Sequence, residues 1–146
     1  MIMTFVKIHI TCKAVKKHKH SLEDIDSLLI YAVLKNNEKA VRVLLKAGID
    51  LDYQDSAGWT ALHGAVFDRN KELTRLLLHY GAAADKKTTE HFERRNDHVI
   101  FYEDSTPIHF AALNNDVEIL KLLIATTPKN VFREHSHGAF FYASLY

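Results

Sequence analysis

The side chains best suited to chemistry in this sequence are its ten histidines, some of which stand close together. Two pairs at i, i+2 spacing occur, in "HKH" at residues 18–20 and in "HSH" at 135–137, and His9 and Cys12 precede the first pair. Imidazole and thiolate groups bind zinc, but a structural zinc site usually needs four ligands, commonly with cysteines at regular short spacing. Neither end of the chain supplies that set, so we predict no metal and no cofactor. A small metal-dependent protein or enzyme that uses the histidine-rich ends is the first alternative.

Motifs for catalysis are equally weak. With five glycines in total, the sequence has no phosphate-binding glycine-rich loop. Cys12 has no recognisable neighbourhood for a nucleophile, and a Cys–His pair cannot be inferred from linear distance alone. Asp50, Asp52, Asp55 and Asp85 stand where turns are expected, and turn formation explains them. We therefore predict a protein that is not an enzyme and has no catalytic residues.

Positive charge is concentrated at the start of the chain. The formal net charge is +1, whereas residues 1–20 contain five lysines and no acidic residue. This basic segment could contact nucleic acid, acidic lipid or an acidic protein, but it lacks interleaved aromatic residues for base stacking and a recognisable reading helix. We predict a solvated extension and no nucleic-acid partner. Nucleic-acid binding through residues 7–20 is the second alternative.

Cysteine content and apolar runs bear on location. Cys12 alone cannot form an intramolecular disulfide, which suits a reducing compartment. No apolar run approaches the roughly 18 residues needed to span a bilayer, and "MIMTFV" is shorter than the roughly 7–15 residue apolar core of a secretory signal. We expect a cytoplasmic protein that is monomeric when free, or one that acts in a host cytosol if it is a secreted effector.

The elements that must position these residues are repeated along the chain. If Ala32, Ala65 and Ala111 mark the same point of a unit, the units are spaced by 33 and 46 residues. Later in each unit, matching residues fall at offsets 0, 3, 4 and 7, which is one stripe of an α-helix. Helices of about 8–10 residues are marginal alone in water, so each stripe must be buried against neighbouring copies, which predicts an all-α solenoid of helix-turn-helix units. The stripes are Ala40, Val43, Leu44 and Ala47; Leu73, Leu76, Leu77 and Tyr80; and Ile119, Leu122, Leu123 and Thr126.

Residues typical of helix ends occur at the expected places. Thr60 and Thr106 can cap the first helix of their units by accepting from backbone N–H groups of the first turn. Pro107 follows at the first helical position, where its missing donor costs little. Gly48 and Gly81 fall where a left-handed residue would end the second helix.

The repeated unit resembles the ankyrin repeat. "DSAGWTALHGAVFDRNKELTRLLLHYGAAAD" (55–85) follows the Asp-x-x-Gly-x-Thr, Ala-Leu-His, Leu-Leu and Gly-Ala pattern of that family, and "STPIHFAALNNDVEILKLLI" (105–124) has the Thr-Pro-Ile-His-x-Ala form. The resemblance covers about residues 22–133 and implies that His63 and His109 hydrogen-bond within their turns and join adjacent repeats. The first copy has Ser27 and Ile30 in place of the Thr-x-x-His motif, as suits a capping repeat.

The 46-residue spacing implies an insertion of 13 residues before the third unit. We expect an enlarged finger whose first part is loop-like and whose "HVIFY" (98–102) is a strand. A second strand is expected in "FVKIHITC" (5–12), and pairing between the two is a hypothesis. The predicted segments are a basic extension at 1–20, an atypical capping repeat at 21–54, a repeat at 55–87, an inserted finger at 88–100, a repeat at 101–133, and a partial repeat or C-terminal cap at 134–146.

The resemblance also implies a function, because ankyrin repeats commonly bind proteins in the groove between their fingers and first helices. Leu34, Phe67 and Leu113 share the outward position of the first helix, where the family commonly has polar residues. Large apolar anchors with polar neighbours are typical of interaction surfaces. The alternative is that the N-terminal segment or the inserted finger covers these residues as core. The predicted partner-binding set is Leu34, Lys35, Trp59, Phe67, Asp68, Leu113 and Asn114.

These observations predict a non-catalytic module that binds another protein on its concave groove and fingers. Its role would be that of an adaptor, an inhibitor or a host-directed effector. A preformed surface limits the ordering cost of binding. The identity of the partner does not follow from the number of repeats, because one fold serves many unrelated partners.

Overall fold

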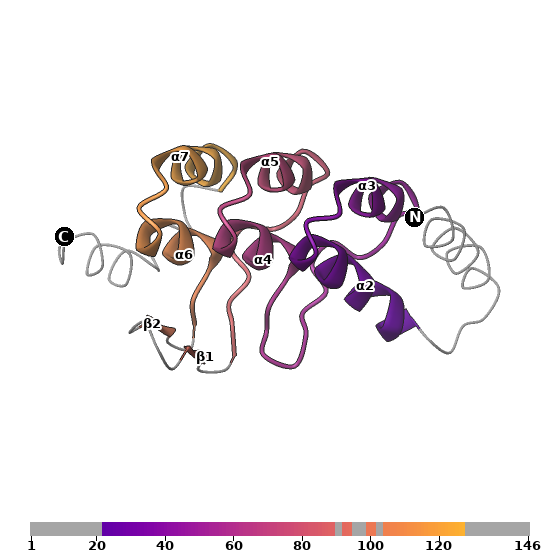
Figure 1. The fold of residues 1–146 in the computed structure, drawn as a ribbon, viewed down its shortest axis with the longest axis horizontal. Coiled ribbons are helices and arrows are strands. Elements are labelled where there is room, and N and C mark those ends of the chain that lie inside the picture. The colour runs from indigo at the N-terminus through magenta and orange to yellow at the C-terminus, as the bar shows by residue number, and fades with distance from the viewer. Residues whose placement is uncertain (1–21, 90–91, 95–98, 102–103, 128–146) are drawn as a thin grey trace.

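A computed structural model describes residues 22–89, 92–94, 99–101 and 104–127. The predicted extension at 1–20, the strand at 5–12, the histidine pairs and the C-terminal cap therefore lie outside the described residues. Three helix pairs stack side by side, with the first helices in one row, the second helices in another, and long loops on the far side of the first row (Figure 1). The predicted helical solenoid is confirmed.

The helices are short and follow the predicted repeat. The first pair is α2 (Leu22–Leu34) and α3 (Glu38–Lys46), the second is α4 (Ala61–Phe67) and α5 (Lys71–His79), and the third is α6 (Pro107–Leu113) and α7 (Val117–Thr126). Contacts between α2 and α4, between α4 and α6, and between α5 and α7 join the pairs. Within the described residues, no helix is long and apolar enough to cross a membrane.

The turn inside each pair has the same construction three times. A residue with positive φ stands two positions after the end of each first helix, at Asn36, Arg69 and Asn115. The second helix then begins after a side-chain cap, in which Asn37, Asn70 or Asp116 accepts a hydrogen bond from the backbone N–H three residues later. After α3 and α5, Gly48 and Gly81 have φ of 75° and 93°, the left-handed region that side chains with a Cβ avoid.

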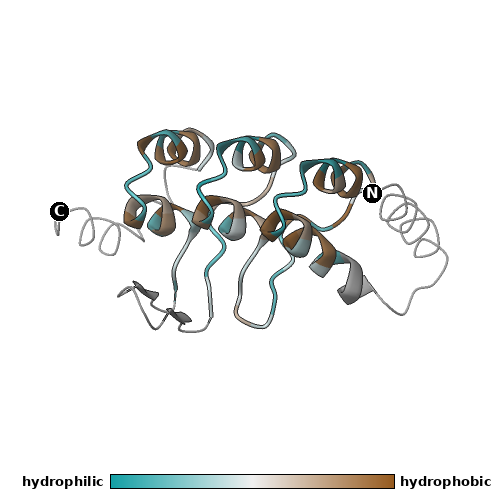
Figure 2. Cartoon of the chain, in the orientation of Figure 1, coloured by the Kyte–Doolittle hydropathy of each residue, from teal (hydrophilic) through white to brown (hydrophobic). Residues whose placement is uncertain are grey.

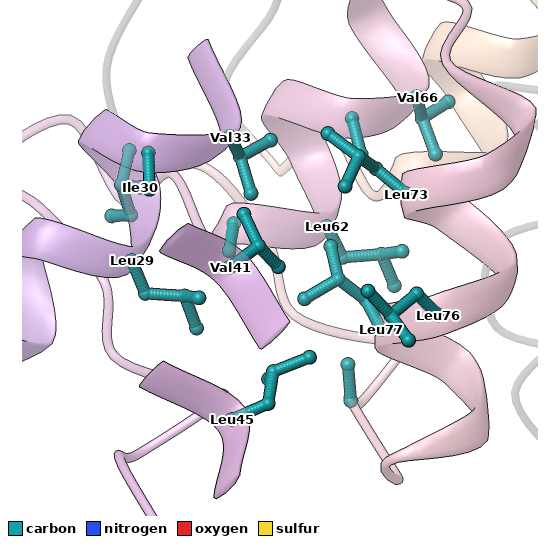
Figure 3. Packing of buried hydrophobic residues seen from close by; sticks show 14 of the residues in the cluster. Leu29, Ile30, Val33, Val41, Leu45, Leu62, Val66, Leu73, Leu76 and Leu77 are labelled. Carbon is teal, nitrogen blue, oxygen red and sulfur yellow. The ribbon is translucent and has the colours of Figure 1, made fainter. Parts of the chain in front are cut away.

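The core lies between the two rows of helices and is apolar along the stack (Figures 2 and 3). The offsets 0 and 4 of the predicted stripes are buried in all three second helices, at Ala40 and Leu44, Leu73 and Leu77, and Ile119 and Leu123. The prediction of burial at offset 7 is wrong: Tyr80 is 39% exposed, Thr126 is exposed, and Ala47 is half-buried. The buried stripe instead widens at offset 1 in the first two units, where Val41 and Thr74 are fully buried.

The inserted finger contains a β-hairpin. Strand β1 (Phe92–Arg94) pairs antiparallel with β2 (Val99–Phe101), with Phe92 opposite Phe101 and Arg94 opposite Val99. The predicted strand in "HVIFY" is present. The first part of the insertion was predicted to be loop-like. This prediction is wrong for Phe92–Arg94, which form the strand that pairs with β2.

Backbone hydrogen bonds tie the base of this hairpin to the rest of the stack. Thr88 donates its N–H to the Ser105 carbonyl at 2.9 Å and accepts from the Asp104 N–H at 3.0 Å, while the Thr89 N–H donates to the Ala57 carbonyl at 3.0 Å. Gly58 is required beside them, because a Cβ there would lie 2.6 Å from the Thr89 nitrogen. The neighbouring fingers are therefore bonded to each other where the insertion leaves the stack.

Two substitutions on α5 test this division between core and surface. Leu77→Ala should lower the free energy of unfolding by about 2–5 kcal/mol, because it removes a fully buried side chain from the middle layer. Tyr80→Ala, at the exposed offset, should cost much less. Urea unfolding followed by circular dichroism measures both, and equal losses would contradict the observed orientation of the helix.

Candidate functional site

His63 and His109 each form a capping box with the threonine three residues earlier, at the starts of α4 and α6. We call these two hydrogen-bonded units, Thr60–His63 and Thr106–His109, the brackets. In the first bracket, the Thr60 N–H donates to His63 Nδ1 at 3.1 Å, and the His63 N–H donates to Thr60 Oγ1 at 3.3 Å. The second bracket repeats this with a 3.0 Å bond from the Thr106 N–H to His109 Nδ1, and Pro107 takes the first helical position. Each bracket satisfies backbone donors that would otherwise lack partners at a buried helix start.

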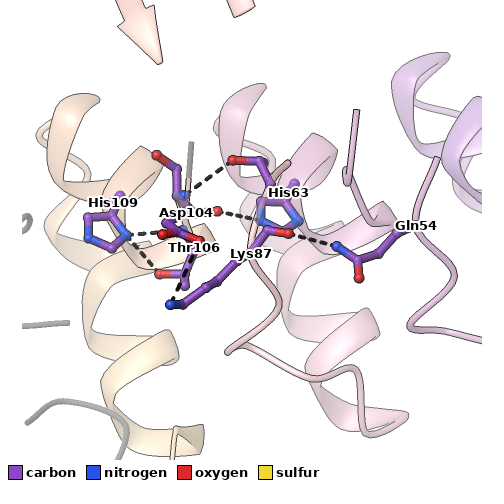
Figure 4. A network of polar contacts seen from close by, with 8 residues as sticks. Gln54, His63, Lys87, Asp104, Thr106 and His109 are labelled. Atoms are coloured by element: carbon purple, nitrogen blue, oxygen red, sulfur yellow. Dashed lines mark hydrogen bonds and ion pairs between the residues drawn. The ribbon is translucent and has the colours of Figure 1, made fainter. Parts of the chain in front are cut away.

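His63 also joins the second repeat to the third. Because its Nδ1 accepts from Thr60, the ring proton lies on Nε2, which donates to the Ser105 carbonyl at 3.2 Å (Figure 4). Burial lowers the pKa of His63 to about 4, against the opposing effect of hydrogen bonds to the Ser105 and Lys86 backbone. The nearby His109 lowers this pKa further. His63 is thus neutral near pH 7, with both ring nitrogens hydrogen-bonded, which gives it a structural role.

Four rings form a cluster beside this bracket. The Trp59 centroid lies 5.5 Å from that of Phe67 and 5.1 Å from that of Phe110, and the His63 centroid lies 5.7 Å from that of Phe110. Phe110 is only 1% exposed, so it fills the junction between α4 and α6. Sequence reasoning missed Phe110. The available signal was that it is a large apolar residue directly after the motif histidine, in the buried first helix of its unit.

The residue directly after the motif position differs in each repeat, and this difference controls how much apolar surface is exposed at each junction between first helices. In repeat order the residues are Tyr31, Gly64 and Phe110. Gly64 has no side chain, and a Cβ there would lie 3.3 Å from a methyl group of Leu34. Leu34 therefore covers Gly64 but is itself 50% exposed, and Tyr31 is 61% exposed. The junction between α2 and α4 keeps apolar surface in solvent, whereas the junction between α4 and α6 is filled by Phe110.

The predicted partner-binding residues do not share one environment. We call Tyr31, Leu34, Trp59, Phe67 and Leu113 the first-helix row. In it, Trp59, Phe67 and Leu113 are half-buried and pack against the core, so only the part of the row on α2 is largely exposed.

The three polar residues predicted beside the row also differ. The Lys35 ammonium lies 5.6 Å from the Tyr31 ring centroid, within reach of a cation–π contact. Asp68 is exposed. Asn114 donates from its side chain to the Phe67 carbonyl at 3.1 Å and to the Val66 carbonyl at 3.3 Å. Its amide group therefore caps the end of α4 and has a structural role.

Within the described ranges, no group of three or more His, Cys, Asp or Glu side chains is placed to hold a metal ion. The histidine pairs at 18–20 and 135–137 lie outside those ranges, as does the basic segment 7–20. The metal-dependent and nucleic-acid alternatives therefore stay predictions without structural support.

Comparison with known families agrees with the repeated brackets and turns. A family model of ankyrin repeats in three copies matches residues 3–90, and a single ankyrin repeat matches residues 103–132. The chain belongs to the ankyrin repeat family. Ankyrin repeats are protein–protein interaction modules and are generally non-catalytic. The matched range begins at residue 3, within the segment that sequence analysis assigned to a basic extension.

Curated relatives have diverse names. The chain is 30% identical to the human transient receptor potential cation channel subfamily A member 1, over 70% of this chain and 9% of that protein. It is 43% identical to the human protein phosphatase 1 regulatory subunit 27, over 37% of this chain and 35% of the relative. A putative ankyrin repeat protein of fowlpox virus is 32% identical over 67% of this chain and 20% of its own length. The chain thus spans about a third or less of each of these relatives.

The low pKa of His63 predicts a loss of stability in acid. A pKa of about 4 in the folded repeat, against 6.5 as the ordinary value, means that the unfolded chain binds the proton more readily. The contribution of neutral His63 to the free energy of unfolding is therefore complete above pH 6.5 and is lost as the pH falls towards 4. The total loss is on the order of 3 kcal/mol.

The matched variant is His63→Asn, which keeps an acceptor near the position of Nδ1 but does not titrate. The difference in unfolding free energy between the unsubstituted protein and this variant should shrink as the pH is lowered from about 7.5 to 4.5. Urea unfolding at several pH values measures it. A difference that stays constant with pH would show that His63 titrates normally in the folded state.

Proposed function

We propose that this ankyrin repeat chain is a non-catalytic module that binds another protein along its first-helix row. The observation that carries the proposal is the exposed apolar surface of α2, where Tyr31 is 61% and Leu34 is 50% exposed. Leu34 lies against Gly64 on α4, the helix that also carries Phe67, whose ring packs against Trp59. Exposed aromatic and aliphatic side chains that continue into a packed cluster are typical of binding surfaces.

The energetics of such a surface support binding. Complete burial of one large apolar side chain is worth about 1.5–3 kcal/mol, so two or three anchors can give useful affinity. The row needs little ordering when it binds, because its helices are already held by the layers beneath and its rings already contact one another. Polar neighbours, among them Lys35 and Asp68, surround the apolar part and could select the partner.

The family and the relatives support a binding role over a catalytic one. One relative is named as a regulatory subunit, which is consistent with a protein that acts by occupying or recruiting another. We propose an adaptor, inhibitor or effector role of this kind, in a reducing cytosol as the lone cysteine suggests. The chain spans a small part of its relatives, so their named activities are not transferred to it.

Affinity capture from native cytosol, analysed by mass spectrometry, tests the proposal with one variant and one control. Leu34→Asp places a charge in the exposed part of the row and should reduce the captured partner at least about tenfold, since burying an unpaired charge is costly. Val117→Asp is the control, because Val117 is similarly exposed (53%) but lies at the start of α7 in the third pair.

Both substitutions should leave the free energy of unfolding within roughly 0.5–1 kcal/mol of the unsubstituted protein, because both sites are half exposed. Trp59 and Phe67 are unsuitable for this test because their rings pack against Phe110 and the core. Capture that is equal for Leu34→Asp and the unsubstituted protein, with both variants folded, would remove the first-helix row as the binding surface.

A further inference from the structure

The charged residues around the exposed part of the row are strongly biased in sign. Between Lys46 and Arg69 the chain has four aspartates, Asp50, Asp52, Asp55 and Asp68, and no lysine or arginine. This stretch contains the first finger and helix α4, which lie beside α2 in the stack. On the α2 side, Lys35 is the nearest basic residue in sequence to Leu34. The stretch from the first finger to the end of α4 is therefore acidic.

Hydrogen bonds fix these carboxylates in place without neutralising them. Asp55 Oδ1 accepts from the Ala57 N–H at 3.0 Å and from the Trp59 N–H at 2.9 Å, and Asp52 Oδ1 accepts from the Ala83 N–H at 2.8 Å. The ion pairs among the described residues are elsewhere, joining Glu38 to Arg42, Glu72 to Arg75, and Lys87 to Asp104. Within the described residues, the first finger thus keeps its negative charge unpaired.

The acidic finger and the apolar part of the row are connected through side-chain contacts and through helix α4. Asp55 holds the backbone of Trp59, and the Trp59 ring packs against the Phe67 ring. Phe67 follows Gly64 by three residues on α4, and Leu34 covers Gly64. One short polypeptide segment could therefore reach from the finger to the α2 surface.

Two carboxylates, those of Asp26 and Asp50, lie close together at the base of the finger. The Asp50 N–H donates to Asp26 Oδ1 at 3.2 Å, which brings two carboxylates together. Partial burial raises the pKa of Asp26; the Asp50 backbone hydrogen bond acts against this, and the Asp50 charge adds to it. A cation placed here would relieve the repulsion between the two carboxylates.

We propose that the partner presents a basic segment with an apolar anchor to this surface. The anchor, a leucine or an aromatic residue, packs on Tyr31 and Leu34, while lysine or arginine side chains lie against Asp50, Asp52 and Asp55. This inference depends on the proposed binding function and adds the chemistry of the partner. An acidic segment is disfavoured, because it would meet these three finger carboxylates. Of the described basic residues near them, Lys35 contacts the Tyr31 ring and Lys87, in the next finger, pairs with Asp104.

The chain's own basic segment, residues 7–20, is a competing occupant, because it directly precedes α2. The family match treats residues 3–90 as one continuous array of repeats, which favours a separate partner over the chain's own N-terminal residues. A second copy of the chain is the other competitor. The experiment distinguishes all three.

A peptide-display library, selected on the immobilised full chain, provides the probes. Enriched peptides should be rich in lysine and arginine around a leucine or aromatic residue. Fluorescein-labelled copies of the best binders are then titrated by fluorescence anisotropy. Asp50 is exposed, and Asp52 and Asp55 are half-buried, so each charge contributes modestly. The affinity of the peptides should fall about tenfold in an Asp50→Asn, Asp52→Asn, Asp55→Asn variant, in which asparagine keeps the Oδ1 acceptor. Their affinity should also weaken when NaCl is raised from about 0.05 to 0.5 M.

Two controls match these changes. Glu38→Gln, Glu72→Gln, Glu118→Gln alters the net charge equally but on the second helices, and it should leave peptide affinity unchanged. For the anchor, Leu34→Ser should weaken binding about tenfold, as expected for the loss of one apolar contact, whereas Val117→Ser should not change it. Circular dichroism and urea unfolding verify that every variant is folded.

Enrichment of acidic or uncharged peptides would overturn the inference, as would binding that the finger variant leaves unchanged. If Leu34→Ser abolishes binding while the finger variant does not, the proposed function survives and the basic partner fails. Substitution of Lys13, Lys16, Lys17 and Lys19 by glutamine in the full chain must not raise peptide affinity, because a gain would make residues 7–20 the occupant. A dimer in sedimentation that the finger variant dissociates would identify a second copy instead.

Discussion

Contact between one helix pair and the next is the interaction on which every other feature of this chain depends. Among the helices of the described residues, all but α2 have 7–10 residues, a length at which an isolated helix is marginal in water. Burial supplies the missing stability: Leu62, Ala65 and Val66 on α4 are fully buried in the middle layer. The stability of one repeat therefore includes that of its neighbours, as in other linear repeat proteins. Surface positions are free to vary only as far as these contacts persist.

The brackets stabilise the same contact between one helix pair and the next. A helix start that is buried between layers needs partners for its backbone N–H groups, and water cannot supply them there. Thr60 and His63 satisfy these groups within the repeat, and the second nitrogen of His63 reaches the next finger at Ser105. Histidine suits this place because one neutral ring accepts on one side and donates on the other. His63, which a search for catalytic or metal-binding residues would select, thus joins two layers.

Features that repeat could be predicted from the sequence, and features that belong to one layer could not. The helix pairs, both brackets and the glycine turns follow from residues such as Thr60 and Gly81 that recur or match a known pattern. Burial at offset 7 failed in the first two units because the helix has already ended there: Ala47 and Tyr80 are the C-caps of α3 and α5. In the third unit Thr126 is the last residue of α7 and is exposed. The first hairpin strand was missed because Phe92–Arg94 has one apolar residue and two charged ones, whereas Val99–Phe101 is apolar throughout.

The site was predicted in part, because equivalent positions were assumed to have equivalent surroundings. Leu34, Phe67 and Leu113 keep the register of the repeat, yet what covers Leu34 and Phe67 depends on the residue that the next repeat places after its motif position. Phe110 covers Phe67, whereas Gly64 leaves Leu34 half exposed. A single position thus decides whether an outward apolar residue becomes internal packing or available surface. Since the rest of the backbone repeats almost unchanged, substitution at this position can move a binding surface along a solenoid without altering the fold.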